Sequence, residues 1–481
     1  MWCFAIAAGC NGGADAPIDA ADTLPPDASL IPAIEITLDR RAETGPDTIL
    51  VDVRVVRDDV PQAGVTVTLV ATNGSVGAIT DQGNGHYLAE VRPSISSGDV
   101  QLTATALGNE SKRTAIVLPT IDAAWGQPER VPGLVNTDGY EDSSEVSPDA
   151  TWLIVSSYSP VDLICCLAAV PTVCTTASTA ADPASIACNA SLGPYAAPAR
   201  PDLPGADRII SSTSIHDSLP RLGLGQPAGT DLPFAVPPVA AYGFKRQPDG
   251  SYGEPFSIAF EADGITSAPF GLTFAKPPSG NSATLIYAWD DFRTQDSSDT
   301  FNDLYRVSIT LGARVILGTF TNGVLDIDPT FVPLTSHAGP QGNPGVAPDG
   351  IFFDAETGDE DIHFAAGDPL GTAPLAAAVT VGISTSANEY QPYFHNGRLF
   401  YARDFAAIRS AARGTGDISQ AATWTDDHIE LGVDGGADIG NVLAIGEPSI
   451  AVIETGTELY FVYGTRTATG IEQSVARVRR R

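Results

Sequence analysis

Hydrophobic and polar residues alternate along the first part of the chain. Between Ile34 and Pro119, the stretches "TILVDVRVVRD", "GVTVTLVATNGSV", "GHYLAEVRPS" and "DVQLTATALG" place apolar residues at about every second position, with Gly, Asn and Asp between them. This period is typical of short antiparallel strands that bury one face. A length of about 85 residues suits roughly seven such strands. The pattern predicts a β-sandwich over residues 34–120.

A longer pattern recurs over the rest of the chain. "EDSSEVSPDATWLIVSS" is echoed by "GNPGVAPDGIFFDAE", "NEYQPYFHNGRLFYARD" and "IGEPSIAVIETGTELYFVYGTR", and less cleanly by "TSAPFGLTFAKPPSGNSATLIYAWDD" and "HDSLPRLGLG". Each clear unit runs from a proline or small residue, through a strand and a Gly or Asp turn, into a second strand rich in aromatic and β-branched residues. "VAAYGFKR", "DLYRVSIT", "DIHFAA", "AIRSAAR" and "IEQSVARV" supply a third strand.

The spacing of these units predicts a β-propeller over residues 121–481. Anchoring each unit on its proline, or on Ser144, gives starts at 144, 220, 269, 344, 392 and 448. Repeats of this size with three or four short strands each are typical of propeller blades. The predicted fold class is all-β, an immunoglobulin-like sandwich followed by a propeller of six blades, with five or seven as open alternatives.

The repeat resembles the WD-like repeat of TolB-type six-bladed propellers, in which a Ser-Pro-Asp-Gly turn joins the inner two strands of a blade. Ser147, Pro148 and Asp149 carry this turn in the first unit, where Ala150 replaces the glycine. Pro348, Asp349 and Gly350 carry it in the fourth. The turn also resembles the Asp-box of sialidases, which is itself structural. The resemblance implies a structural role for these residues.

The sandwich segment is similar to the bacterial immunoglobulin-like domains of invasin and intimin type. The resemblance implies a rigid spacer that is sometimes adhesive, and it places His86 on a surface strand. The matching residues are Gly64, Val65, Val67, Leu69, the Gly83-Asn84-Gly85 turn, Tyr87, Ala89, Val91, Pro93 and Gly98.

A second internal match predicts how the propeller closes. "AAWGQPERVPGLVNTDG" (Ala123 to Gly139) parallels "GSYGEPFSIAFEADG" (Gly250 to Gly264), with Trp125 over Tyr252. The second copy leads out of one blade, so the first copy is expected to be an outer strand as well. We expect it to pair beside "IEQSVARVRR" and to leave no exposed edge in the ring.

The net negative charge of the chain limits the kinds of molecule that it can bind. The chain has 58 acidic and 26 basic residues, and lysine occurs only at Lys112, Lys245 and Lys276. Nucleic acid and anionic membrane surfaces would be repelled, whereas cations and basic patches would be attracted. The simpler interpretation is a solvated acidic surface.

The N-terminus, "MWCFAIAAGCNGG", resembles a bacterial lipoprotein signal that ends in a lipobox, with Cys10 as the lipidated residue. Ala7 stands where leucine is usual, and no Lys or Arg precedes the apolar run. Residues 1–10 would be the signal remnant and residues 11–33 a disordered tether, because little in them can be buried. A frayed coil with a chance cysteine is the alternative. The resemblance implies a protein of the bacterial cell envelope.

Four cysteines lie close together in a segment rich in Ala, Thr, Ser and Pro. In an exported protein they predict two disulfides that staple an insertion near residues 163–205, with three possible connectivities. A zinc site is the alternative, although the spacing lacks Cys-x-x-Cys pairs. The four are Cys165, Cys166, Cys174 and Cys188.

Acidic residues precede four of the unit starts and are candidates for a binding face around a central channel. If they face the channel, they would attract a cation, a basic peptide or a sugar. If they cap turns by accepting backbone N–H bonds, they are structural. The candidates are Glu141, Asp142, His216, Asp217, Glu389 and Glu447.

Two acidic loops are candidate calcium sites, because calcium binds six to eight oxygens from closely spaced carboxylates. Neither has the Asp-x-Asp-x-Asp-Gly order of a helix-loop-helix site, and a solvated loop is the alternative. The first contains Asp290, Asp291, Asp296, Asp299 and Asp303, and the second Asp354, Glu356, Asp359, Glu360 and Asp361.

The sequence therefore predicts an exported, lipid-anchored protein that binds a protein or a polysaccharide of the envelope or extracellular space through its propeller face. Its membrane contact would be the lipid alone, at the outer membrane, the periplasm or the cell surface. No catalytic residue is assigned, since the chain lacks Gly-x-Ser-x-Gly, His-Glu-x-x-His and Walker-type motifs. A glycoside hydrolase using paired carboxylates and a purely structural surface protein are the alternatives.

Overall fold

The computed structural model describes residues 33–40, 48–137, 140–159, 240–262, 265–267, 270–290, 302–321, 324–327, 332–335, 341–356, 360–436, 438–466 and 471–481. Over these ranges the protein is all-β, with several antiparallel sheets and one short 3-10 turn, Ala421–Thr423. None of the helical structure in these ranges is long and apolar enough to span a bilayer. Cys10, nearly all of the tether and the four clustered cysteines lie outside the described residues.

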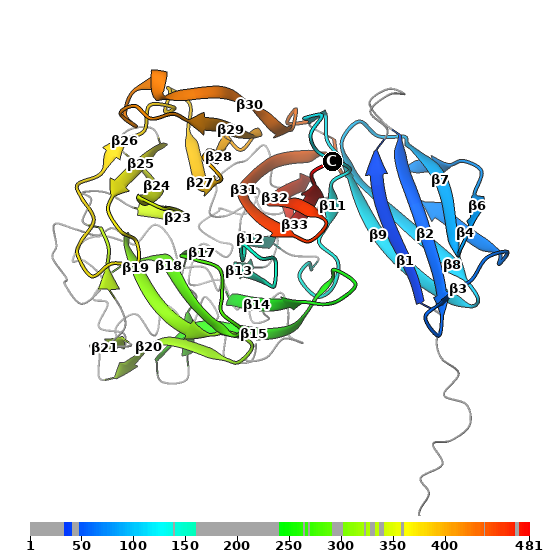
Figure 1. Cartoon of the computed structure of the whole chain (residues 1–481), viewed down its shortest axis with the longest axis horizontal. Coiled ribbons are helices and arrows are strands. Elements are labelled where there is room, and N and C mark those ends of the chain that lie inside the picture. The colour runs from blue at the N-terminus through cyan, green and yellow to red at the C-terminus, as the bar shows by residue number, and fades with distance from the viewer. Residues whose placement is uncertain are drawn as a thin grey trace, which may run out of the picture.

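The first part of the chain forms two sheets that pack face to face (blue and cyan in Figure 1). Inward residues alternate with outward ones along each strand, and Val51, Val53, Val100 and Leu102 form the middle of the core. The strands expected from the alternation are present. One sheet contains β1 (Ala33–Arg40), β2 (Ile49–Arg57), β3 (Val60–Pro61), β5 (Gly74–Val76), β6 (Thr80–Gly83) and β7 (His86–Pro93), and the other β4 (Val67–Ala71), β8 (Gly98–Ala106) and β9 (Asn109–Val117).

The second part forms five units of four antiparallel strands. The strands of a unit follow one another in the chain, except that two other strands precede the last strand of the second unit and that the last strand of the fifth comes from before the first. The first unit is β12 (Tyr140–Val146), β13 (Trp152–Ser159), β14 (Ala240–Arg246) and β15 (Tyr252–Ala262). The second is β17 (Phe270–Phe274), β18 (Ser282–Asp290), β19 (Asn302–Thr310) and β22 (Val332–Pro333). The third is β23 (Gln341–Ala347), β24 (Gly350–Glu356), β25 (Glu360–Ala366) and β26 (Val379–Thr380).

The fourth unit is β27 (Glu389–His395), β28 (Arg398–Arg403), β29 (Ala407–Arg413) and β30 (Trp424–Gly432). The fifth has β31 (Val442–Ile453), β32 (Gly456–Arg466) and β33 (Ile471–Arg479), and its fourth strand is β11 (Glu129–Arg130), from before the first unit. Smaller strands β16 (Ile265–Ser267), β20 (Val315–Thr321) and β21 (Val324–Ile327) extend the edge of the first unit.

The first strands of the five units lie around a common centre (Figure 1). β12 contacts β17, β17 contacts β23, β23 contacts β27, β27 contacts β31, and β31 contacts β12. These contacts make a closed ring of five inner strands. The predicted starts at 144, 269, 344, 392 and 448 all fall on or next to these strands, and the start at 220 lies outside the described residues.

Strand β14 shows why the unit predicted at 220 is not needed to close the ring. β14 pairs directly with β13, in a register that joins Leu153 to Phe244. "VAAYGFKR" is therefore the third strand of the first unit, and residues 160–239 are inserted between its second and third strands. Sequence spacing had suggested a separate unit at this point.

The predicted closing strand pairs where expected. In β11, Glu129 pairs with Arg477 and Arg130 with Ala476 of β33, and Trp125 bridges to Arg480. The match of Trp125 with Tyr252 is consistent with this, since Tyr252 begins β15, the fourth strand of the first unit. The prediction that residues near 125–130 complete the last unit is confirmed.

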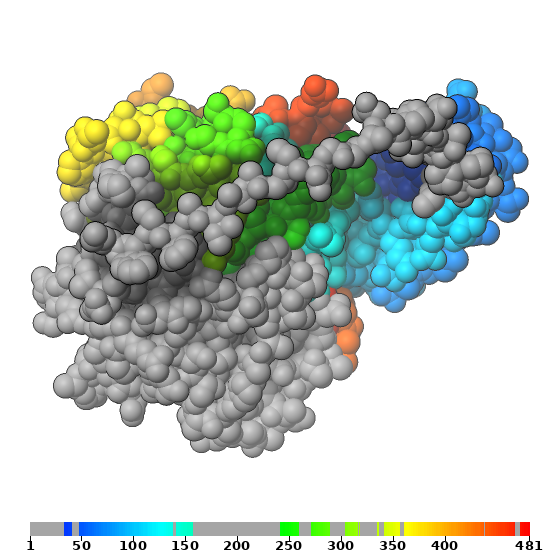
Figure 2. Space-filling model, turned by 90° about the horizontal axis from the view of Figure 1, so that it is seen from below, coloured from blue at the N-terminus to red at the C-terminus, as the bar shows by residue number. Residues whose placement is uncertain are grey.

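The same strand joins the sandwich to the ring. Glu129 also pairs with Ala115 of β9, so one sheet runs from the sandwich into the fifth unit. β10 (Thr120–Ile121) pairs with β30 of the fourth unit. Figure 2 shows the blue and cyan sandwich strands directly beside the green first unit.

Candidate functional site

Each inner strand carries one residue in the left-handed backbone region at an equivalent place. Pairing with the next strand slips there in β17, β23, β27 and β31, which makes a β-bulge, and in β12 the left-handed residue is left unpaired. Proline follows in three cases, at 344, 392 and 448. The five residues are Ser143 (φ 55°), Gly271 (φ 53°), Asn343 (φ 39°), Gln391 (φ 54°) and Glu447 (φ 54°).

These five left-handed residues surround a cavity of about 30 Å³. Its walls are short runs from every inner strand, residues 143–145, 271–272, 343–344, 391–393 and 447–448. A volume of this size holds about one water molecule or one monatomic ion. The space that these five runs enclose is therefore small.

Asp142 and Glu447 meet beside the cavity. Their carboxyl groups hydrogen-bond to each other. Glu447 Oε2 accepts the Ser144 amide at 2.9 Å, and Asp142 Oδ1 accepts Gln473 Nε2 at 2.6 Å. Loss of hydration raises the pKa of both carboxyl groups, and the neighbouring Asp142 charge raises the pKa of Glu447 further.

Two more carboxyl groups are buried near the centre. Glu145 Oε1 accepts Thr273 Oγ1 at 2.8 Å. Asp354 Oδ2 accepts Asn343 Nδ2 and the Gln391 amide, both at 2.8 Å, so it ties β24 to two inner strands. Burial raises the pKa of both carboxyl groups. Their hydrogen-bond donors are neutral.

No basic side chain in the described ranges neutralises these acids. Within the described ranges, no Arg, Lys or His forms an ion pair with any of the four, which we call the central carboxyl group: Asp142, Glu145, Asp354 and Glu447. Buried charges in proteins are normally paired or bound to metal. Four buried acidic side chains therefore lie near the centre without a basic partner among the described residues.

An aromatic pair lies next to the cavity. The rings of Tyr390 and Phe405 stack with centroids 4.3 Å apart and an interplanar angle of 17°. Phe405 is 39 % exposed and has a left-handed backbone (φ 51°), which is uncommon for a bulky residue. A Cβ placed on Gly446 would lie 2.6 Å from Gln391 Oε1 and 3.4 Å from Phe405 Cδ1, so the aromatic ring lies beside the Gln391 side chain.

The sequence-predicted acids separate into two groups. Asp142 and Glu447 lie at the centre. Glu141 and Glu389 instead hold the loop before their inner strand: Thr137 donates its amide (3.2 Å) and hydroxyl to Glu141, and Thr385 donates its amide (3.0 Å) and hydroxyl (2.8 Å) to Glu389. Burial raises the pKa of Glu141 to about 8. Both arrangements match the capping alternative weighed from the sequence.

The structure describes few of the other site residues predicted from the sequence. His216, Asp217, Asp291, Asp296 and Asp299 lie outside the described residues. Asp290 and Asp303 end β18 and begin β19 near one another, since Asp290 pairs with Asn302 and Trp289 with Asp303. The calcium loop proposed from the sequence therefore stays a prediction.

Sequence reasoning missed part of the centre. Asp354 was assigned to an acidic loop, and Glu145, Asn343 and Gln391 were not singled out. A usable signal was present, because Asn343, Gln391 and Glu447 each stand directly before the proline of their unit. In three of the five inner strands, the polar residue directly before a proline lies at the bulge and lines the central cavity.

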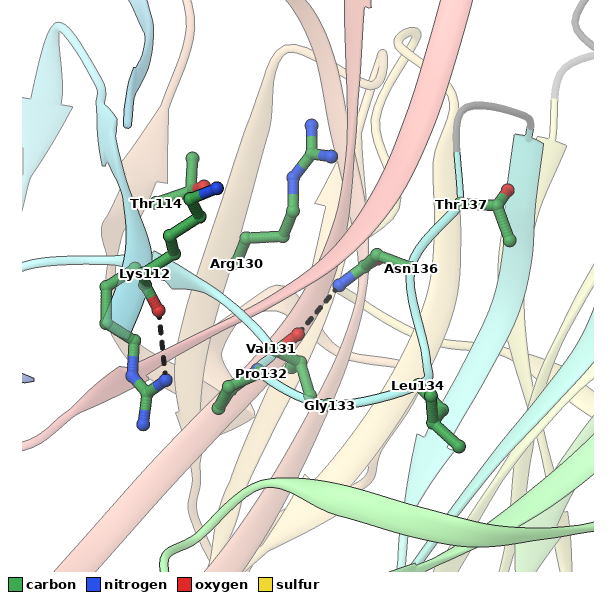
Figure 3. A pocket seen from close by; sticks show the side chains of 10 residues that line it. Lys112, Thr114, Arg130, Val131, Pro132, Gly133, Leu134, Asn136 and Thr137 are labelled. Atoms are coloured by element: carbon green, nitrogen blue, oxygen red, sulfur yellow. Dashed lines mark hydrogen bonds between the residues drawn. The ribbon is translucent and has the colours of Figure 1, made fainter. Parts of the chain in front are cut away.

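A larger groove of about 540 Å³ lies between the sandwich and the ring (Figure 3). Lys112 of β9 lies on one side of it, and the segment from Arg130 to Thr137 on the other (Figure 3). Its size suits a small molecule. Arg130 is already paired with Asp99 (2.7 Å) and Glu472 (2.9 Å), so little positive charge there is uncommitted.

Comparisons with known proteins give no family for the chain. No protein-family model matches, and no curated protein matches. Among solved structures, it is similar to a Bacteroides thetaiotaomicron protein of unknown function (9% identity, TM-score 0.23, covering 92% of this chain and 71% of that one). It is also similar to the Yersinia pseudotuberculosis adhesin InvE (12%, 0.16, 80% and 67%) and to invasin, a bacterial integrin-binding protein (10%, 0.16, 93% and 79%). TM-scores this low do not define a common fold.

Proposed function

We propose that this protein is an exported binding protein of the bacterial cell envelope, anchored by a lipid on Cys10, in which an immunoglobulin-like spacer carries a five-bladed β-propeller. Five four-stranded units, a closed ring of inner strands and a last unit completed by β11 support the propeller assignment. The acidic balance of the chain supports a partner other than nucleic acid.

The aromatic pair beside the central cavity, half-buried Tyr390 and exposed Phe405, carries the proposal of a binding face. Aromatic rings offer a flat apolar surface, and the polar side chains of Gln391 and Asn343, held by hydrogen bonds to Glu447 and Asp354, lie at the bulges of the adjoining cavity. This combination suits a sugar ring, which has apolar C–H faces and a rim of hydroxyl groups. We therefore propose that the ligand is a polysaccharide of the envelope or the extracellular space.

The hydrolase alternative is less well supported by the same geometry. Glycoside hydrolysis needs two carboxyl groups about 5–9 Å apart, with the sugar between them. Asp142 and Glu447 instead contact each other directly, and the adjoining cavity holds about one small ion.

A glycan-array screen tests the proposal. The purified chain is applied to arrayed polysaccharides with calcium and again with chelator, and the Phe405→Ala variant is applied in parallel. Binding of a defined glycan that is lost in the variant is the expected result, since the variant removes the exposed ring of the aromatic pair.

Val70→Ala is the matched control, because Val70 is 62 % exposed on β4 of the sandwich, away from the ring. It should bind as the unaltered chain does. If no glycan binds under either condition, or if Phe405→Ala binds unchanged, the proposed face is wrong, and a protein partner or a purely structural role takes its place.

A further inference from the structure

The central cavity has the features of a cation site that the predicted calcium loops do not explain. It lies where five strands meet, and two of the four residues of the central carboxyl group line it. Glu145 and Glu447 line its wall, and both are 7 % exposed. Their hydrogen bonds from Thr273 and Ser144 come from neutral groups, so no cationic side chain among the described residues would balance their charge on ionisation.

An unsatisfied hydroxyl group points independently to a ligand. Ser144 is 4 % exposed and lines the cavity, and its Oγ has no hydrogen-bond partner. A buried hydroxyl without a partner is costly, and each such case in a protein calls for an explanation. A ligand in the cavity would satisfy it.

The donor atoms select the class of ligand. The cavity wall offers carboxylate oxygens from Glu145 and Glu447, the Ser144 hydroxyl and the amide oxygen of Asn343, whose Nδ2 is used by Asp354. It offers no sulfur and no imidazole. All-oxygen sets suit hard cations such as calcium, and the volume of about 30 Å³ suits a single ion.

Gln391 fixes the orientation of Glu447. Its Oε1 accepts the Glu447 amide at 2.8 Å, and its Nε2 donates to Glu447 Oε1 at 3.2 Å. Gln391 is thus a positioning residue that holds one carboxylate of the cavity wall in place. Outer-shell partners of this kind are typical of built metal sites.

We propose that the central cavity binds one calcium-class divalent cation through Glu145, Glu447 and Ser144. The ion supplies the positive charge that the central carboxyl group lacks. Because residues on β12 and β31 both hold it, the ion also closes the ring where its first and last units meet. The cavity adjoins the glycan face proposed at Phe405, and a calcium titration tests it whether or not a glycan binds.

Isothermal titration of the full chain with calcium, after treatment with chelator, tests the proposal. One ion per chain is expected in the unaltered protein. Glu447→Gln should weaken its affinity at least tenfold, and Gln391→Ala about 10- to 100-fold, as loss of an outer-shell partner does. The double variant Asp296→Asn and Asp299→Asn, in the predicted calcium loop, should leave it unchanged.

A second cluster serves as a further control. Atoms of Asp122, His428 and Glu430 lie within 4.8 Å of one another, but Glu430 is already bonded to Trp125 Nε1 at 2.6 Å. His428→Ala should therefore not alter calcium binding. Binding that is lost in the loop variant or in His428→Ala, and retained in Glu447→Gln, would overturn the proposal, as would no binding at all.

Terbium luminescence locates the ion even if Glu447→Gln fails to fold. Terbium replaces calcium in oxygen sites and emits when a nearby tyrosine is excited. Tyr393 lines the cavity, so Tyr393→Phe should bind terbium with unchanged affinity and reduced sensitised emission. Unchanged emission would place the ion elsewhere and contradict the proposal.

Discussion

The two regions that bury acidic side chains differ in the source of their positive charge. In the fifth unit, Glu458 is fully buried, with Arg246 Nη1 2.6 Å from its Oε2 and Arg479 Nε 2.9 Å from its Oε1. Burial alone would raise its pKa, but the hydrogen bond from Arg246 and the charge of Arg477 lower it to about 2. At the centre, Glu447 has no such partner among the described residues, and its pKa is raised.

The comparison distinguishes buried acidic side chains that have a cationic partner in the protein from those that lack one. Glu458 is part of an arginine network that joins β14, β32 and β33. The arginines neutralise its negative charge within the folded protein. Glu447 lies at a strained bulge next to a small cavity and a hydroxyl without a partner. A buried acid thus indicates a ligand when its surroundings leave its charge unmatched.

The largest expected effect comes from removing an arginine of the network. Arg477 is 3 % exposed and contacts Glu129 at 2.8 Å and the Gly250 carbonyl at 2.7 Å. Arg477→Met should lower the free energy of unfolding by about 3–5 kcal/mol, since Glu129, whose side chain is only 13% exposed, would keep only the longer 4.0 Å contact with Arg113. Urea denaturation measures this, with Arg54→Met as the control. The Arg54–Glu35 pair is 42% and 45% exposed, and its loss should cost less than about 1 kcal/mol.

Glu458→Gln should cost somewhat less and should depend on pH. The folded pKa of about 2 lies below the ordinary value of 4.5, so the stabilisation is present above pH 4.5 and is lost as the pH falls toward 2. A shift of this size corresponds to about 3 kcal/mol at pH 7. Unfolding curves of the two proteins should therefore converge between pH 4.5 and 2. Curves that stay parallel over that range would show that the arginine network does not hold the charge of Glu458.

At the centre, backbone geometry should matter more than charge when no cation is present. Gly271 has φ 53°, and a Cβ there would lie 2.8 Å from the Asn343 amide nitrogen. Gly271→Ala should cost about 1–3 kcal/mol, as a strained residue does. Gly280→Ala is the control, because Gly280 has φ 59° with open space around its Cβ position. Equal losses in thermal unfolding would show that the close approach of β17 to β23 does not matter.

The smallest effect is expected from Glu447→Gln measured with chelator. It makes the same chemical change as Glu458→Gln, but the glutamine amide can donate to Asp142 in place of the carboxyl proton. The free energy of unfolding should change by about 1 kcal/mol or less. A loss as large as that of Glu458→Gln would mean that Glu447 has a cationic partner within the protein.

Much of the architecture was predictable because the alternation of apolar and polar residues in a strand shows which of its faces is buried. Alternation gave the sandwich strands, and the prolines at 344, 392 and 448 gave three of the inner strands. The pairing of β14 with β13 was not predictable, because a strand pattern does not identify its partner across residues 160–239. The predicted unit at 220 lies outside the described residues, so the structure corrects only the assignment of β14.

The centre was predictable only in part. Glu447 stood out as an acid before a proline, and Asp142 as an acid before Ser144. Glu145 and Asp354 did not, because strand bulges and long-range packing decide which side of a strand meets the cavity. The separation of Asp142 from the capping Glu141 likewise depends on how the chain turns at Ser143.

The measurement that tests the account most directly is the gain in unfolding free energy on adding calcium, compared between the unaltered protein, Glu447→Gln and Glu458→Gln. A cation bound only to the folded state adds about 2.7 kcal/mol at 100 times its Kd. We predict this gain for the unaltered protein and for Glu458→Gln, and little or none for Glu447→Gln. Equal gains in all three proteins, or no gain in any, would contradict the claim that the positive charge at the centre comes from a bound cation.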